Sequence, residues 1–325
     1  MDAATAQQAL AVHKVTLPHV AGMPVHLHFV ASKTTTAPAA SLAALAAEGR
    51  PLAVAFLLHG RLGESEALDS TAAALVQRCA GVDDTRQHRN LVVVTLDHRN
   101  HGHRRVRDLA NESWRAGNET HAQDMFSIQY GTAQDVSLLI SLLPAYLPAA
   151  LRIELWASLG GHSTWLALLH DPRITVGVPI IGCCDYLRLM RNRVQGMLAR
   201  KNTGDHDDAA EAREEEEERY LPEGLKRALR QLDAGGMGEP AVQRLKGRKV
   251  LVLCGADDRL VPYHCSQPFI ERLQHAMAAT TDLGGLCEVV VEEGKGHELT
   301  DTMVIKTGDW LVRWACTREG QDARL

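Results

Sequence analysis

A serine, an aspartate and a histidine each stand just after an apolar stretch of this chain of 325 residues. Ser158 follows "RIELWA", Asp258 comes shortly after "KVLVLCG", and His297 lies in "GKGHELT", beyond "CEVVVEEG". Together these side chains can transfer an acyl group. The hydroxyl attacks a carbonyl, the imidazole takes and returns its proton, and the carboxylate orients the imidazole. The pattern therefore predicts nucleophilic catalysis, provided that the fold gathers the three residues.

The elements that would gather them are short apolar runs alternating with longer amphipathic stretches. The runs show no polar alternation, which is typical of parallel strands covered on both faces by helices. We predict an α/β fold, with strands at 52–60, 91–99, 152–157, 174–182, 249–255 and 287–294 after an antiparallel hairpin at 13–30. Ligands bind at the carboxyl ends of such strands, and the three residues lie there.

Five short motifs follow successive strands in the sequence: "HGRLG", "DHRNHGHRR", "SLGGHS", "GADDRLVP" and "GKGHELT". With the order Ser, Asp, His and a serine between a strand and a helix, the chain resembles the α/β-hydrolase superfamily from about residue 50 onward. Within it, the chain is similar to the dienelactone-hydrolase and prolyl-oligopeptidase-like esterases. The resemblance implies an α/β-hydrolase fold: a mostly parallel central sheet, helices on both faces and a helical cap insertion.

The domain organisation follows from the same pattern. We expect residues 1–325 to form a single domain of this fold. Residues 183–247 contain no predicted strand and are expected to form the cap, whereas the Ala-rich residues 34–50 form a surface insertion. The acidic block 205–220 is interpreted as a solvated helix face or a disordered loop.

Ser158 is the predicted nucleophile, because a hydroxyl directly after a strand stands at the sheet edge, near the positive end of the next helix. Gly160 permits close approach of the strand and the helix. Ser163 matches the motif in part but lies well inside the predicted helix. Trp156 departs from the G-x-S-x-G pattern, which has a glycine two residues before the serine. We interpret it as a core residue and leave two alternatives open: it shapes the pocket, or it distorts the turn and disables catalysis.

His297 is the predicted general base, because a glycine-rich loop lets its imidazole approach the serine. The acid is either Asp257 or Asp258, and the resemblance favours Asp258, which is separated from Val-Pro by two residues. The resemblance also implies that the backbone N–H groups of Arg61 and Leu159 form an oxyanion hole. The side chain of Arg61 has two interpretations: contact with an acidic group of the substrate, or a position at the pocket rim.

The substrate pocket is less well defined by the sequence. Trp114, with Asn118 or His121 nearby, is expected to line it, together with Tyr186 from the cap and Trp156 from the strand. The histidines of "DHRNHGHRR" lack a carboxylate–histidine pattern that would complete a metal site, so no metal is predicted. In this motif, Asp97, Arg99 and Gly102 are instead expected to brace the loop beside the site.

Composition excludes several other classes of function. A net charge of -5 and a pI near 6.3 give no electrostatic case for nucleic-acid binding. No apolar run is long enough to span a membrane, and the N-terminus does not resemble a secretory signal. The seven cysteines are scattered apart from one adjacent pair, which favours buried thiols in a cytoplasmic protein. No cofactor is implied, and the sequence does not define an oligomeric state.

The sequence thus predicts a serine hydrolase that cleaves small or medium-sized carboxylic esters through an acyl-enzyme on Ser158. Two alternatives remain. One is a prolyl-oligopeptidase-like peptidase, which is less favoured because only about 50 residues precede the core. The other is a non-catalytic binding protein built on a hydrolase fold, for which Trp156 is the only argument.

Overall fold

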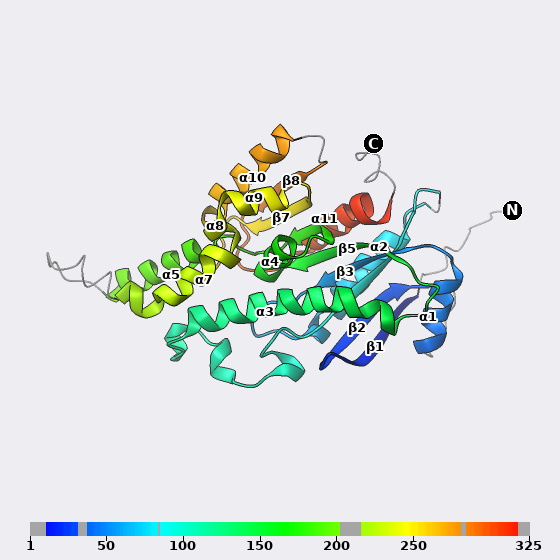
Figure 1. The fold of residues 1–325 in the computed structure, drawn as a ribbon, viewed down its shortest axis with the longest axis horizontal. Helices are drawn as coiled ribbons and strands as arrows, with labels where there is room; N and C mark the ends of the chain where they lie inside the picture. Colours follow the sequence, from blue (N-terminus) through cyan, green and yellow to red (C-terminus); the bar gives the residue numbers. More distant parts are fainter. Residues whose placement is uncertain (1–10, 32–37, 84, 202–215, 281–283, 318–325) are drawn as a thin grey trace.

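A computed structural model describes residues 11–31, 38–83, 85–201, 216–280 and 284–317. Its centre is an eight-stranded sheet with the order β1-β2-β4-β3-β5-β6-β7-β8 (Figure 1). Strand β2 runs antiparallel to its neighbours β1 and β4, and the other neighbouring pairs are parallel. The strands are β1 (Val12–Val20), β2 (Met23–Val30), β3 (Leu52–Leu57), β4 (Asn90–Thr95), β5 (Ile153–Gly160), β6 (Ile174–Pro179), β7 (Lys249–Gly255) and β8 (Leu286–Glu292).

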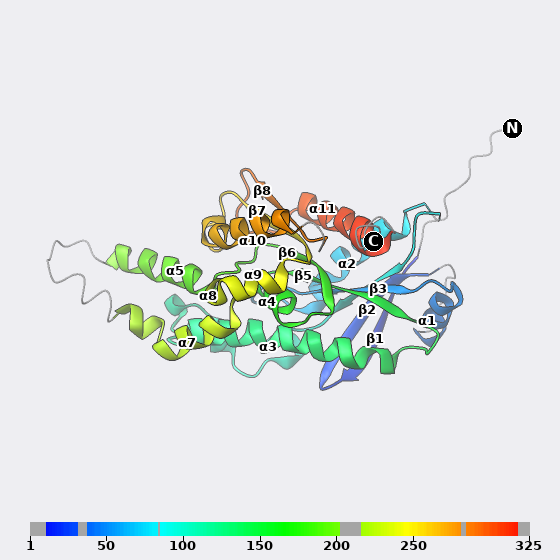
Figure 2. The same cartoon turned by 45° about the horizontal axis from the view of Figure 1, so that its top comes forward.

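Helices cover both faces of this sheet (Figure 2). They are α1 (Pro38–Ala47), α2 (Asp69–Ala80), α3 (His121–Leu142), α4 (His162–His170), α5 (Tyr186–Lys201), α7 (Glu223–Leu232), α8 (Ala234–Met237), α9 (Glu239–Leu245), α10 (Gln267–Ala279) and α11 (Asp301–Leu311). Short 3-10 turns and one π turn occupy Ser65–Leu68, Gly102–Arg104, Asp108–Asn111, Trp114–Ala116, Leu143–Tyr146, Tyr263–Cys265 and Val312–Cys316. Among the described residues, no helix is long and apolar enough to cross a membrane.

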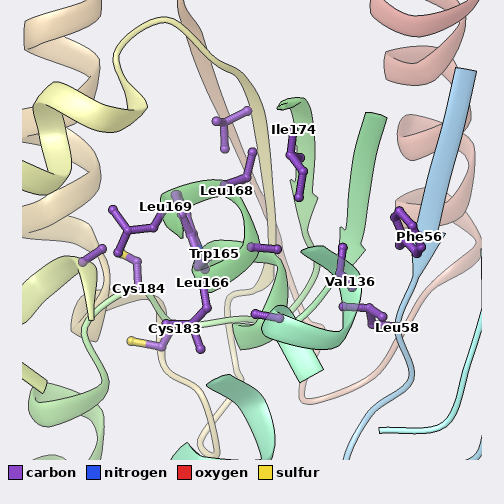
Figure 3. Packing of buried hydrophobic residues seen from close by; sticks show 14 of the residues in the cluster. Phe56, Leu58, Val136, Trp165, Leu166, Leu168, Leu169, Ile174, Cys183 and Cys184 are labelled. Carbon is purple, nitrogen blue, oxygen red and sulfur yellow. The ribbon is translucent and has the colours of Figure 1, made fainter. Parts of the chain in front are cut away.

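Alternation along the strands divides the core into two layers. In β3, Val54 and Phe56 pack in the layer that contains α3, α4 and α10, whereas Ala55 and Leu57 pack in the layer that contains α2 and α11. Figure 3 shows part of the first layer, with Leu168 of α4 near Ile174 of β6. Helix α4 lies so close to β6 that a Cβ on Gly177 would come 2.4 Å from a methyl carbon of Leu168. A larger residue at 177 would therefore have to displace the Leu168 side chain from its place in this layer.

Most predicted elements are present, with altered ends. The hairpin forms as β1 and β2, and the Ala-rich segment is helix α1, whose Leu42 and Leu45 are buried. Residues 34–37 and 202–215 lie outside the described part of the chain. The rest of the expected cap is helical: it comprises α5, α7, α8, α9 and a helical stretch at 216–220. The sequence placed the end of the fifth strand at residue 157, but β5 continues to Gly160.

The loop after β4 is braced as the sequence predicts. Asp97 Oδ1 accepts the N–H of Ser65 at 2.8 Å, and Oδ2 accepts the N–H of His103 at 2.8 Å. Burial alone would raise the pKa of Asp97, but these hydrogen bonds lower it to about 2. Gly102, at φ +48°, leaves room for the carboxylate, which a Cβ there would meet at 2.2 Å. The loop that follows β4 is thereby fixed to the segment that follows β3.

Arg99 extends the same brace to helix α3. Its Nε and Nη2 donate to the buried carboxylate of Asp135 at 3.0 and 2.9 Å, and Arg104 Nη1 lies 2.8 Å from the same group. Gly131 makes room for this contact, because a Cβ there would lie 2.6 Å from Arg99 Cδ. A single carboxylate on α3 therefore holds two arginines of the loop.

Replacing Asp135 by alanine is expected to lower the free energy of unfolding by about 2–3 kcal/mol, because two guanidinium groups lose their shared partner. Urea denaturation measures the change. Asp309→Ala, which removes the exposed ion pair with Arg78, is the matched control and should cost less than about 1 kcal/mol. Equal losses in the two variants would show that Asp135 does not brace the loop.

Candidate active site

A cavity of about 880 Å³ opens at the carboxyl ends of the central strands. Its wall contains residues that follow β3 and β5, residues of α3 and α5, and the segments around Val261 and Leu299. Apolar side chains make up much of the lining: Leu57, Leu58, Leu68, Met125, Ile128, Ile180, Ile181, Met197, Val261 and Leu299. A cavity of this size at this edge of a parallel sheet is the expected place for a small-molecule ligand.

His297 and Asp258 meet at the wall of this cavity. His297 Nδ1 lies 2.8 Å from Asp258 Oδ2, and Asp258 Oδ1 accepts the N–H groups of Leu260 at 2.8 Å and Val261 at 2.9 Å. The Asp258 side chain is 1% exposed, whereas that of His297 is 42% exposed and lines the cavity. Burial would raise the pKa of Asp258, but the hydrogen bond from His297 and the two backbone amides lower it. The neighbouring Asp257 is exposed to solvent.

Ser158 is not beside this pair. It lies inside β5, paired with Phe56 of β3 and Gly177 of β6, and it is fully buried. Its Oγ is 3.2 Å from Oγ1 of Thr164 in helix α4, and Ser158 is absent from the described cavity lining. The sequence interpretation placed Ser158 in the turn that follows the strand. The structure differs because β5 keeps its pairing for three residues beyond the predicted end, which directs Ser158 towards α4.

The turn from β5 to α4 is instead made by two glycines. Gly160 has φ +132°, and a Cβ there would lie 2.7 Å from the carbonyl oxygen of Leu58. Glycine is therefore required both for the conformation and for the close approach of β3. Helix α4 then begins at His162, which lines the cavity. Its Nδ1 accepts the N–H of Cys183 at 2.9 Å, and burial lowers its pKa to about 4, so the imidazole is neutral.

Of the other residues expected at the catalytic site, some line the cavity and some are buried away from it. Leu159 is fully buried in β5, where its carbonyl accepts the N–H of Leu58 at 2.9 Å, and it is not part of the described lining. Arg61 lines the cavity, and its own N–H has no hydrogen-bond partner among the described groups. Ser163 also lines the cavity, but its buried hydroxyl donates to the Gln129 carbonyl at 3.0 Å.

Of the expected pocket residues, Trp114 and His121 line the cavity and pack against each other, with ring centroids 5.0 Å apart. Three others lie outside the described lining: Asn118, Trp156 and Tyr186.

These three side chains have partners elsewhere. The Asn118 amide donates to the Glu112 carbonyl at 3.2 Å and so holds its own loop. Trp156 stacks on Phe56, with ring centroids 6.0 Å apart, and packs against the core, which agrees with the interpretation as a core residue. Tyr186 is buried, and its hydroxyl donates to the Ala122 carbonyl at 2.8 Å.

Sequence reasoning missed three histidines that line the cavity together: His59, His98 and His101. The ring centroids of His59 and His98 are 4.3 Å apart, and those of His59 and His101 are 5.2 Å apart. His59 Nε2 accepts the N–H of His98 at 2.9 Å, while Nδ1 donates to the Gly60 carbonyl at 2.7 Å. Burial lowers the pKa of His59 to about 4 and lowers the pKa values of the other two. Within the described ranges, no group of side chains is arranged to hold a metal ion.

Solved structures show what the chain is similar to. The crystal structure of TT1662 from Thermus thermophilus superposes with a TM-score of 0.59 at 18% identity, over 94% of this chain and 98% of that one. A puromycin-hydrolyzing peptidase from Mycobacterium tuberculosis gives a TM-score of 0.50 at 15% identity, over 94% of this chain but 39% of the peptidase. The chain has the α/β-hydrolase fold. No protein-family model matches the sequence, and no curated protein does.

In this α/β-hydrolase fold, the buried histidines of the site make stability depend on pH. The pKa of His59 is about 4 in the folded protein, whereas a histidine in the unfolded chain has the ordinary value of 6.5. The unfolded chain therefore takes up the proton first as the pH falls. The stability that neutral His59 provides is therefore complete above about pH 6.5 and is lost progressively as the pH falls to about 4.

At pH 5 this loss is expected to be about 2 kcal/mol for His59. The measurement is the free energy of unfolding between pH 7.5 and 5 for the wild type and for His59→Gln, which should show a shallower decline. His275→Gln, at an exposed position in α10, should decline like the wild type. If His59→Gln declined as steeply as the wild type, this assignment would be wrong.

Proposed function

We propose that the protein is a hydrolase that cleaves carboxylic esters of small or medium size. The observation that carries this proposal is the Asp258–His297 hydrogen bond, which presents a half-exposed imidazole to a cavity of about 880 Å³. In this role Asp258 holds the imidazole through Nδ1 and stabilises the imidazolium, which leaves Nε2 to act as the general base. The pairing of an acid and a histidine beside a largely apolar cavity suits ester cleavage by acyl transfer.

The developing negative charge on the substrate oxygen requires fixed donors. The Arg61 N–H, which has no partner among the described groups, can supply one. The first turn of α4, at His162 and Ser163, lies on the same cavity, and backbone N–H groups at a helix N-terminus have no acceptor within the helix. We assign the oxyanion site to the space between these two segments, in place of the buried amide of Leu159.

Ser158 remains the proposed nucleophile. For its hydroxyl to reach His297, Leu159 and Gly160 must leave the sheet, so that the turn begins at Ser158. That change breaks the hydrogen bonds from Leu58 N–H to Leu159 and from Ile180 N–H to Gly160. Gly160 and Gly161 have no side chains to relocate, so the cost falls on these hydrogen bonds and on the buried side chain of Leu159. The acyl-enzyme would then be hydrolysed by water that His297 activates.

The burial of Ser158 favours a second candidate function, a ligand-binding protein without catalysis. Peptide cleavage by a peptidase of the prolyl-oligopeptidase type stays the alternative activity, but nothing in the described cavity wall favours an amide substrate over an ester. The proposed location is the cytoplasm, which is supported by the burial of all seven cysteine thiols.

A fluorophosphonate probe, which modifies activated serines, is expected to label the wild type on Ser158, as located by peptide mass spectrometry. Ser158→Ala should lose the label, and Ser163→Ala, the matched control in the first turn of α4, should keep it. Label on Ser163 would contradict the assignment of the nucleophile. Ester hydrolysis without any label would contradict a serine mechanism and point to water activated by His297. Folded protein with neither label nor hydrolysis would favour the binding protein.

The acid provides an independent check. Asp258→Asn is expected to lower kcat for an ester substrate at least about 1000-fold, because the amide cannot stabilise the imidazolium. Asp257→Asn, the adjacent control, should leave kcat within about twofold, since that side chain is exposed to solvent. Similar losses in the two variants would refute the role of the Asp258–His297 pair.

A further inference from the structure

The cavity wall carries four guanidinium groups, those of Arg61, Arg115, Arg193 and Arg259. None of them forms an ion pair with any described residue. The described lining contains one carboxylate, that of the exposed Glu298, and Asp258 behind the wall is engaged by His297. The cavity therefore has an excess of positive charge that the described part of the protein does not balance.

Several buried carboxylates elsewhere in the structure do pair with arginines. Arg99 and Arg104 share the buried carboxylate of Asp135, and Arg173 pairs with the buried carboxylate of Asp171 at 2.7 Å. The chain as a whole has a net charge of -5, so carboxylates are not scarce. Four guanidinium groups without an ion pair to a described residue thus gather on one cavity, although the chain has carboxylates to spare.

Arg193 is the most informative of the four. It projects from α5, and its Nε and Nη2 donate to the carbonyl of Leu260 at 3.1 and 2.7 Å. A carbonyl satisfies donors but does not neutralise the charge. Burial lowers the pKa of Arg193, and the nearby charge of Arg61 lowers it further. Keeping a cation in such a place costs free energy unless a ligand supplies the opposite charge.

Arg193 and Arg61 act on the same space as the rest of the site. Burial is the main cause of the low pKa of His121, and the charges of both arginines lower it further. The charge of Arg193 also lowers the pKa of His162, again after burial. Both histidines line the cavity and are neutral, so they add hydrogen-bonding groups without adding charge.

We propose that the substrate carries an anionic group, a carboxylate or a phosphate, that Arg193 and Arg61 bind while its scissile carbonyl faces His297. Guanidinium groups bind both anions through paired, charge-assisted hydrogen bonds. Arg61 Nη1 donates to the Asn111 carbonyl at 2.9 Å, which fixes the direction of that side chain. The apolar part of the lining, with Met125 and Ile128 from α3, would hold the hydrocarbon between the anion and the carbonyl. The presence of a scissile carbonyl in the substrate rests on the proposed ester hydrolysis, whereas the binding of an anion by the two arginines does not.

The test measures binding, so that it does not depend on catalysis. Three anilides that share a three-methylene spacer after the amide carbonyl serve as probes: glutaric acid monoanilide, 4-phosphonobutananilide and the uncharged pentananilide. Isothermal titration of the wild type should show that at least one anionic probe binds about tenfold or more tightly than pentananilide. The preferred anion identifies the source, carboxylate or phosphate. If neither anionic probe bound more tightly than pentananilide, the inference would be overturned, whatever esters the protein cleaves.

Variants locate the anion site. Arg193→Met should reduce the ratio of anionic to uncharged affinity at least about fivefold, and Arg193→Lys should restore part of it because the charge remains. Arg191→Met is the matched control: Arg191 is on the same helix but pairs with Glu217 at 2.9 Å, and the ratio should not change. An unchanged ratio in a folded Arg193→Met variant would overturn the role of Arg193. Anion preference without any ester hydrolysis would leave this site standing and refute the proposed function instead.

Discussion

Hydrogen bonds on both sides of β5 decide which side chains reach the cavity. The carbonyls of Leu159 and Gly160 accept N–H groups from the segments that follow β3 and β6, at 2.9 and 2.6 Å. While this pairing lasts, side chains alternate between the two faces of the sheet, and Ser158 faces α4. The chain can turn towards the cavity only after the last pair. The first residue of α4 is consequently His162. The end of β5 therefore determines that an imidazole, and not the Ser158 hydroxyl, lines the cavity at this edge of the sheet.

A common physical environment links the histidines and the arginines of the site. Low polarity around the cavity keeps His59, His121 and His162 neutral, because a buried imidazolium would lose its hydration. The same environment weakens screening, so the charge of Arg193 acts over a longer range than it would in water. Neutral rings that donate and accept hydrogen bonds therefore surround fixed cations. This division of roles gives the cavity a positive sign without a charge on His59, His121 or His162.

Much of this organisation was predictable from the sequence, because it depends on local patterns. Uninterrupted apolar runs located the strands, and "DRLVP" with "GKGHELT" identified Asp258 and His297, which the structure places 2.8 Å apart. The end of β5 was not predictable in the same way. "SLGG" has the composition of a turn, and its extended conformation depends on β3 and β6, which lie far away in the sequence. Arg193 was also missed: α5 contains several arginines, and nothing local distinguishes the one that faces the cavity.

The backbone of Leu260 connects the two halves of the site. Its N–H donates to Asp258, and its carbonyl accepts from Arg193. An anion that attracts Arg193 competes with that carbonyl and so acts on the residue that positions the acid. Reciprocity would then apply: if anion binding changed the proton affinity of the Asp258–His297 pair, protonation of the pair would change the affinity for the anion by the same factor. The proposed anion site and the acid–histidine pair therefore share one residue of backbone, Leu260, so a shift of that residue would be felt at both ends of the cavity.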